Sequence, residues 1–231
     1  MSTTTLAQVS SPIGSSEHLQ RGVVEVQHPL IAWHLAQLRS LSTPAAEFRQ
    51  LVRRLTSLLV YEATKDLLTE PVTVETPLTT TQGARLSQRV GLVPILRAGL
   101  GMVDPVLDLI PTAEVWHLGL YRDEETATPV EYYRKFPHHR AVDVALILDP
   151  MLATGGSAIV TLAALHNWGV SQIKVISLLA AEAGVRRVET EFPDAQIYVG
   201  QIDPELNDKK FIVPGLGDAG DRIFNTPDTE G

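Results

Sequence analysis

Mostly apolar runs that alternate with helix-like segments constrain the fold of this chain more than any other feature. The run Val90–Leu96 is continuously apolar, as expected for a strand buried on both faces of a parallel sheet. Further strand-like runs are Val144–Leu148, Ile173–Ala180 and Gln196–Ile202, and helix-like segments cover Gly155–Trp168 and Ala183–Thr190. This alternation predicts βαβ units with right-handed crossovers. We therefore expect an α/β fold in which helices flank a mainly parallel, twisted sheet.

Other predicted elements surround this pattern. Thr43 is expected as the N-cap, and Pro44 as the first residue, of a helix that reaches Leu68. Strands are expected at residues 71–76 and 114–121, with a helix near residues 101–109. The segment from Arg122 to Arg140 is charged, aromatic and interrupted by proline. We expect it to form a β-hairpin-like hood over the sheet.

The length and the ends of the chain suggest one domain. The chain has 231 residues, of which 44% are hydrophobic, and this suits a single α/β domain. We expect that domain at residues 23–226, between a disordered N-terminal tail (1–22) and a C-terminal tail (227–231). The N-terminal tail lacks the apolar region of a signal peptide. No stretch approaches the roughly 18 apolar residues of a membrane span. A cytoplasmic protein is expected, and the absence of cysteine is compatible with that location.

Composition excludes several kinds of chemistry. The chain has no cysteine, so disulfides, thiol catalysis and cysteine-ligated metal sites are excluded. Its formal net charge of -8 disfavours binding to nucleic acid or to an anionic membrane. The adjacent His138 and His139 should point in opposite directions on an extended segment, so no protein metal site is expected. An anionic substrate would have to be attracted by local arginines, helix N-termini or a metal.

The sequence "ILDPMLATGGSAI", residues 147–159, carries the first functional signal. Asp149 ends a predicted strand, and ligands of open α/β sheets bind at the carboxyl ends of strands. The turn Ala153–Ser157 then leads into a helix whose free N–H groups face whatever occupies the turn. Glycines allow close approach, and hydroxyls add donors. This pattern suits a sugar phosphate, although the glycine pair is also compatible with a plain turn.

The same stretch also resembles a known family. "DPMLATGGS" is similar to the loop that binds phosphoribosyl pyrophosphate (PRPP) in phosphoribosyltransferases, and in particular in the uracil phosphoribosyltransferases. "PILRAGLGM", "YEAT", "LYRDEET" and "PGLGDAGDRIFNT" match that family as well. Most families of this fold carry two adjacent acidic residues where this chain has Asp149 and Pro150. The resemblance implies the phosphoribosyltransferase fold.

Residue roles follow from the resemblance. It implies that PRPP is bound by Arg97, Arg122, Asp149, Pro150, Met151, Leu152, Ala153, Thr154, Gly155, Gly156, Ser157 and Asp218. It implies that uracil is bound at Ile212, Gly217, Asp218 and Ala219, mainly by backbone groups. Asp149 and Asp218 are the expected catalytic residues, and Asp218 is the candidate base for uracil N1.

Three of these motifs have simpler interpretations. Arg97 could pair with a surface carboxylate, and Arg122 could belong to a solvated charged turn. The glycines of "PGLGDAGD", residues 214–221, could form a surface turn. They also spell the dinucleotide pattern G-x-G-x-x-G, but the few residues that follow leave no room for the βαβ unit that this pattern needs.

The resemblance implies a complete reaction. Uracil and PRPP would give UMP and pyrophosphate in pyrimidine salvage, with Mg2+ carried mainly on the pyrophosphate of PRPP. A homodimer or homotetramer and a GTP effector are further partner hypotheses. Two alternatives stay open: transfer to a different base, and a PRPP-sensing regulator or catalytically silent relative. The intact sugar-phosphate and base loops favour the enzyme.

Overall fold

The structure, a computed structural model, describes residues 22–122, 129–134 and 141–226. Its centre is a seven-stranded sheet with the order β1-β11-β10-β8-β4-β5, to which β9 adds beside β10. These strands are β1 (Val23–Glu25), β4 (Val90–Pro94), β5 (Glu114–Val115), β8 (Val144–Leu148), β9 (Met151–Leu152), β10 (Gln172–Ala181) and β11 (Gln196–Asp203). Every pairing among them is parallel. The predicted, mainly parallel sheet is confirmed.

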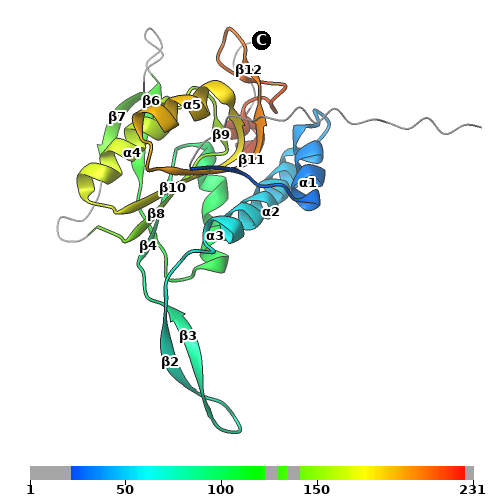
Figure 1. The fold of residues 1–231 in the computed structure, drawn as a ribbon. Helices are drawn as coiled ribbons and strands as arrows, with labels where there is room; N and C mark the ends of the chain where they lie inside the picture. The colour runs from blue at the N-terminus through cyan, green and yellow to red at the C-terminus, as the bar shows by residue number, and fades with distance from the viewer. Residues whose placement is uncertain (1–21, 123–128, 135–140, 227–231) are drawn as a thin grey trace, which may run out of the picture.

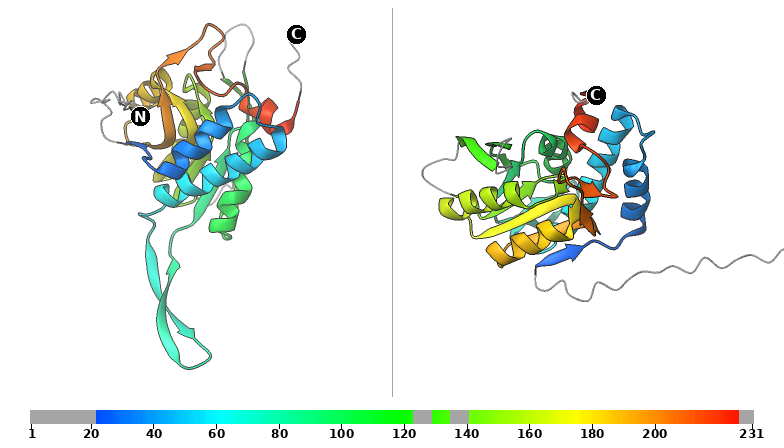
Figure 2. Two further views of the ribbon diagram at one scale, coloured as in Figure 1. Left: turned by 90° about the vertical axis from the view of Figure 1, so that its right-hand side faces the viewer. Right: turned by 90° about the horizontal axis from the view of Figure 1, so that it is seen from above.

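Helices cover both faces of the sheet (Figures 1 and 2). One face carries α1 (Pro29–Arg39), α2 (Ala45–Ala63) and α3 (Val103–Leu109), and the other carries α4 (Gly156–Trp168) and α5 (Glu182–Glu191). Strand β8 explains why the strands read as continuously apolar. Val144, Leu146 and Leu148 are buried under α1–α3, whereas Ala145 and Ile147 are buried under α4 and α5. The predicted α/β fold class is therefore confirmed.

The predicted start of the 44–68 helix was wrong by one residue. Pro44 has extended backbone angles and occupies the cap position, and α2 begins at Ala45. Thr43 caps nothing in α2, because its hydroxyl donates to the carbonyl of Gln37 at the end of α1, at 2.6 Å. The helix also ends early, at Ala63. There the Ala63 carbonyl accepts a hydrogen bond from the buried Lys174 ammonium, at 2.6 Å.

The predicted strand 114–121 is in fact two strands. Its first part, β5, stays in the main sheet, and the Trp116 N–H donates to the Leu92 carbonyl at 2.8 Å. The chain then leaves the sheet as β6 (Leu118–Arg122), which pairs antiparallel with β7 (Pro129–Arg134). Residues 123–128 and 135–140 lie outside the described residues, so the extent of the hood stays a prediction. The expected helix near 101–109 is a 3-10 turn, η1 (Ala98–Met102), followed by α3.

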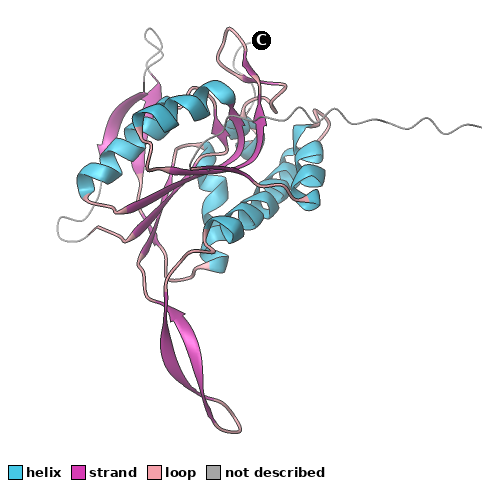
Figure 3. Cartoon of the chain, in the orientation of Figure 1, coloured by secondary structure: helices cyan, strands magenta, loops and turns pink. Residues whose placement is uncertain are grey.

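The strand expected at residues 71–76 is present as most of a slightly longer strand, but the hairpin that it forms and a second hairpin were not predicted. Strands β2 (Thr69–Glu75) and β3 (Thr80–Leu86) pair antiparallel and extend away from the helix-covered sheet (Figures 1 and 3). Strands β12 (Glu205–Leu206) and β13 (Ile212–Val213) form a short second hairpin before the last helix, α6 (Ala219–Phe224). Within the described parts of the chain, no helix is long and apolar enough to cross a membrane.

Candidate active site

The ends of β4 and β8 meet where the chain changes direction across the sheet. From β4 the chain runs through α3 to β5, and from β8 it runs through α4 to β10 on the other side. Helices α3 and α4 pack on opposite faces. Such a switch point opens a crevice at the carboxyl ends of the two strands, and ligands of open α/β sheets bind there.

Residues 153–157, which we call the phosphate loop, join β9 to α4 beside this switch point. Gly155 adopts the left-handed angle φ = 77° and occupies the cap position of α4 without any side-chain cap. The first N–H groups of α4 therefore lack an intrahelical partner and point into the turn. These groups and the positive end of the helix dipole are features that favour an anion at this position.

The phosphate loop is positioned by contact with α5, which no sequence motif predicts. A Cβ atom at Gly184 would lie 2.3 Å from the Ala153 carbonyl oxygen, and one at Gly155 would lie 3.0 Å from the Gly184 carbonyl oxygen. Glycine at 184 therefore lets the start of α5 pack directly on the loop. This residue was missed because its role depends on tertiary packing alone.

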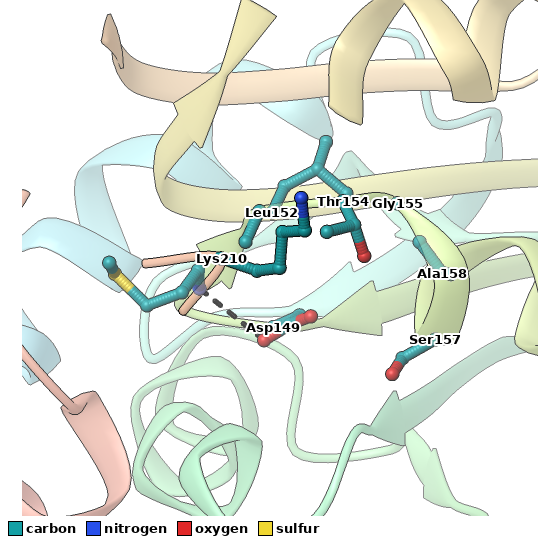
Figure 4. Close-up of a pocket in the computed structure, with 10 residues that line it drawn as sticks. Asp149, Leu152, Thr154, Gly155, Ser157, Ala158 and Lys210 are labelled. Carbon is teal, nitrogen blue, oxygen red and sulfur yellow. Dashed lines mark hydrogen bonds between the residues drawn. The ribbon is translucent and has the colours of Figure 1, made fainter. Parts of the chain in front are cut away.

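Asp149 lies in a pocket formed with the phosphate loop (Figure 4). The pocket measures about 150 Å³. Its lining consists of Asp149, Met151, Leu152, Ala153, Thr154, Gly155, Gly156, Ser157, Ala158 and Lys210. The predicted residues 149 and 151–157 are thus together in one place. Pro150 does not line the pocket, and its carbonyl instead accepts hydrogen bonds from the Leu178 and Leu179 N–H groups, both at 3.1 Å.

The Asp149 carboxyl group is held in an unusual electrostatic state. Burial raises its pKa to about 7, although the Met151 N–H, which donates to Oδ1 at 3.3 Å, opposes that shift. A carboxyl group with this pKa changes charge near neutral pH. It can accept hydrogen bonds from sugar hydroxyls when ionised, and hydroxyls or cations in the pocket would favour that ionised form. A perturbed acid in a pocket is typical of a functional site.

Arg97 follows β4 at the same edge of the sheet. A Cβ atom at Gly99 would lie 2.3 Å from the Leu148 carbonyl oxygen, so the 97–99 loop lies directly against the end of β8. Arg97 itself is exposed and donates to Asp221 at 2.8 Å. Hydrogen bonds from Thr226 and from Arg97 hold the pKa of Asp221 below its usual range. Arg97 therefore pairs with a surface carboxylate, in agreement with its simpler interpretation.

Residues 214–221, which we call the uracil loop after the predicted ligand, follow β13 and lead into α6. Gly215 and Gly217 have φ angles of 55° and 81°. A Cβ atom at Gly215 would lie 2.0 Å from the Ile212 carbonyl oxygen, whereas one at Gly217 would meet nothing within 4 Å. Gly215 therefore closes the loop against Ile212, while the backbone at Gly217 is open to a ligand.

Asp218 caps α6 and is exposed. Its Oδ1 accepts a hydrogen bond from the Asp221 N–H at 2.9 Å, which leaves the second oxygen for other contacts. A Cβ atom at Gly220 would lie 3.1 Å from Asp218 Oδ1 and 3.5 Å from Arg97 Nη2. Asp218 is thus close to Arg97, but it is not among the residues that line the Asp149 pocket. Arg122 ends β6, and its side chain lies outside the described part of the structure.

A buried ion pair that sequence reasoning missed fixes the start of the uracil loop. Arg39, at the end of α1, donates to both Asp203 oxygens at 2.7 and 2.6 Å and to the Gly215 carbonyl at 2.8 Å. Asp203 is 2% exposed and also accepts from the Gly215 N–H at 3.0 Å. Both backbone groups of Gly215 are therefore held by one pair of side chains.

A second arginine fixes the end of the uracil loop. Arg222 donates to the carbonyls of Leu38, Ser40 and Leu216 at 2.8, 2.6 and 2.9 Å. Its guanidinium also lies over the Phe48 ring, 4.3 Å from the ring centre. The loop is thus anchored to α1, to α2 and to the connection between them, which are far away in the sequence.

The chain matches known proteins over nearly all of this architecture. Residues 24–226 match the family model described as uracil phosphoribosyltransferase. A uracil phosphoribosyltransferase of Roseiflexus sp. (strain RS-1) is 57% identical over 200 residues, which cover 87% of this chain and 96% of that protein. One from Brevibacillus brevis is 50% identical over 200 residues, covering 86% and 96%.

A solved structure is similar over nearly the whole chain. The AQ2163 protein from Aquifex aeolicus is similar with a TM-score of 0.83 and 39% identity, over 88% of this chain and 98% of that one. The fold, the loops at the switch point and these relatives agree with one another. The chain belongs to the uracil phosphoribosyltransferase family.

Proposed function

We propose that this protein transfers the phosphoribosyl group of PRPP to N1 of uracil, giving UMP and pyrophosphate in pyrimidine salvage. The observation that carries the proposal is the pocket that joins Asp149 to an uncapped helix N-terminus at the switch point. Relatives named uracil phosphoribosyltransferase support the choice of base. The reaction is a pentosyl transfer.

The phosphate loop is the proposed site of the 5′-phosphate of PRPP. The uncapped N–H groups of α4 would donate to the phosphate oxygens, and the hydroxyls of Thr154 and Ser157 would add to them. Asp149, in the same pocket, would accept hydrogen bonds from the ribose hydroxyls. When the C1′ bond breaks, positive charge develops on the sugar. An ionised Asp149 nearby would stabilise that charge.

Arg97 and Arg122 are the proposed partners of the pyrophosphate. Arg97 would exchange Asp221 for the pyrophosphate oxygens, because a charge-assisted contact with a polyanion outcompetes an exposed pair with one carboxylate. As the leaving group gathers negative charge, both guanidinium groups would neutralise it.

The uracil loop is the proposed reader of the base. A backbone N–H at Gly217 or Ala219 would donate to uracil O4, and a carbonyl at Ile212 or Gly217 would accept from N3–H. Because Ala219 begins α6, its N–H has no partner within the helix. Asp218 would lie near N1, and its free oxygen is the candidate base for that proton.

Magnesium fits this site as a partner of the substrate. In the described parts of the chain, no group of three His, Asp or Glu side chains could hold a metal ion. The pocket offers the Asp149 carboxylate, and bound PRPP would add the oxygens of its pyrophosphate. Mg2+ binds one or two carboxylates plus substrate phosphates in such sites. When bound, it would add positive charge at the leaving pyrophosphate.

Three further expectations go with this proposal. A cytoplasmic location is expected from the sequence, whereas assembly into homodimers or homotetramers and a GTP effector come from the resemblance. Size-exclusion chromatography coupled to light scattering would measure the assembly. Assays with and without GTP at several PRPP concentrations would test the effector.

The test of function is direct. Protein, Mg2+, PRPP and one base are mixed, and the nucleotide product is separated by chromatography. We expect UMP from uracil and the 5-fluoro analogue from 5-fluorouracil, because position 5 makes no hydrogen bond. Cytosine reverses the donor and acceptor at C4 and N3, so we expect discrimination of roughly 10²–10⁴-fold. PRPP binding without UMP formation would instead indicate a regulator, and preference for another base would overturn the assignment of the uracil loop.

A further inference from the structure

Lys210 brings a positive charge into the pocket from a part of the chain outside the predicted site. It lies in the turn between β12 and β13, yet it lines the same pocket as Asp149 and the phosphate loop. Figure 4 shows its side chain extended across the pocket, with the ammonium group near Leu152 and Thr154. The cation therefore shares this pocket with the N-terminus of α4.

The backbone at Lys210 is held in a conformation that suits glycine. Its φ angle is 65°, in the left-handed region where a side chain is unfavourable. The turn fixes this conformation. The Lys210 N–H donates to the Asn207 carbonyl at 2.8 Å, the Asn207 N–H to the Phe211 carbonyl at 2.9 Å, and the Phe211 N–H to Asn207 Oδ1 at 2.8 Å. A strained, rigidly held lysine that lines a pocket suggests a role for its side chain.

The charge of Lys210 is not neutralised within the described structure. No carboxylate among the described residues pairs with its ammonium, whereas Lys65 pairs with Glu62 and Lys174 with Asp66. The whole chain carries a formal net charge of -8, so Lys210, which shares the pocket with Asp149, is a local positive charge in an acidic protein. A cation beside uncapped helix N–H groups favours an anionic ligand.

We propose that Lys210 binds the 5′-phosphate of PRPP and of UMP, together with the phosphate loop. The inference rests on the proposed function, because PRPP and UMP are the ligands that place a phosphate there. The phosphate accepts hydrogen bonds from the start of α4 on one side and from the Lys210 ammonium on the other. A charge-assisted contact of this kind is stronger than a neutral one.

The position of Lys210 also connects the phosphate to the base. The turn at 207–211 runs directly into β13 and from there into the uracil loop, whose first glycine packs against the Ile212 carbonyl. A phosphate bound to Lys210 therefore restrains the segment that enters the uracil loop. Lys210 is in this sense a binding residue for the phosphate and a positioning residue for the base.

Calorimetric binding of UMP and uridine tests the proposal, since the two ligands differ in the phosphate alone. Lys210→Met keeps the length and the Cβ atom but removes the charge. We expect it to weaken UMP and PRPP by about 10- to 100-fold, the effect of one charge-assisted contact, and to leave uridine within twofold. Lys210→Arg should stay close to the wild type. Lys209→Met, which makes the same change of net charge one residue away, is the control.

The variant Lys210→Gly provides a second test, which compares its melting temperature with its affinity for UMP. Glycine accepts the left-handed backbone, so this variant should melt at the same temperature as the wild type or higher while losing UMP affinity. If Lys210 had only a structural role, its replacement by glycine would not lower UMP affinity while keeping the melting temperature. Equal UMP and PRPP binding by wild type and Lys210→Met, or an equal loss for uridine, would overturn the inference. Because these measurements need no turnover, failure of the proposed function would appear separately, as absence of UMP formation by the wild type.

Discussion

The phosphate loop and the uracil loop are held in place by different kinds of contact. The phosphate loop is set by backbone packing between α4 and α5, where Gly155 and Gly184 allow close approach. The uracil loop is set by charged side chains: Arg39 at the end of α1, Asp203 at the end of β11 and Arg222 in α6. Adding a methyl group at one of these glycines should therefore displace the phosphate loop. Removing one of these charges should displace the uracil loop. The predictions below use this difference, beginning with the largest expected effect.

Gly184→Ala should damage the phosphate loop most. The new Cβ atom would lie 2.3 Å from the Ala153 carbonyl oxygen, so the loop or α5 must move. Misplacement by about 1 Å can cost about 10²-fold in rate, and we expect at least that loss in kcat/KM for PRPP. Glu182→Ala, a half-exposed change at the start of α5 that removes only an ion pair with Arg186, is the control. Normal PRPP kinetics in Gly184→Ala would show that the loop does not depend on this contact.

Asp149→Asn should reduce turnover by about 10², the scale of one preorganised electrostatic group. The amide keeps the shape of the carboxyl group but cannot stabilise positive charge on the sugar. The measurement is kcat at saturating PRPP and uracil. Near-normal turnover would remove Asp149 from the mechanism.

The raised pKa of Asp149 adds a pH signature. Its folded-state pKa of about 7 lies above its ordinary value, so between about pH 4 and pH 7 the folded chain keeps a proton that the unfolded chain has lost. The stability that this group contributes is therefore present in acid and lost as the pH rises through 7. Asp149→Asn avoids that loss, so its melting temperature relative to the wild type should be higher at pH 8 than at pH 5. A difference that does not change with pH would contradict the raised pKa.

Arg39→Met should affect the uracil loop selectively. It leaves the buried Asp203 carboxylate without its partner, which costs about 3 kcal/mol of stability and releases the Gly215 carbonyl. We expect KM for uracil to rise about tenfold, with binding of PRPP nearly unchanged. Adding Asp203→Asn should recover part of the stability. Arg53→Met, which breaks only exposed pairs with Asp104 and Asp108, is the control and should change neither the KM for uracil nor the binding of PRPP. If Arg39→Met weakened uracil and PRPP equally, the separation of the two loops would be refuted.

Asp221→Asn should have the smallest effect, and it should be a gain. Arg97 would no longer need to leave a carboxylate before binding pyrophosphate. Exposed pairs contribute about 0.2–1 kcal/mol, so PRPP should bind up to about fivefold more tightly. Asp104→Asn removes the same charge elsewhere and is the control. Unchanged or weaker PRPP binding would show that Arg97 and Asp221 do not compete with the substrate.

The residues of the phosphate-binding pocket lie mostly in one short motif, whereas the uracil loop is held by residues far apart in the sequence, and this difference explains which features could be predicted. The phosphate loop is a local motif, and Asp149 precedes it by a few residues, so its position could be inferred from one short stretch. The sheet was predictable because both faces of β8 are buried, which leaves a continuous apolar run. Arg39 and Asp203 are 164 positions apart, and no local pattern joins them. Lys210 was missed for the same reason.

Different halves of the hydrophobic core flank the two loops, although Ala153, in the phosphate loop, also contacts the half under α1–α3. Leu152, Val185 and Val188, around the phosphate loop, pack in the core under α4 and α5. Ile212, Leu216 and Ile223, around the uracil loop, pack in the core under α1–α3. The sheet separates these cores, and mutations at distant sites without shared partners act independently. Changes on one face could therefore alter the choice of base while leaving recognition of the sugar phosphate intact, which gives this architecture a modular route to new specificities.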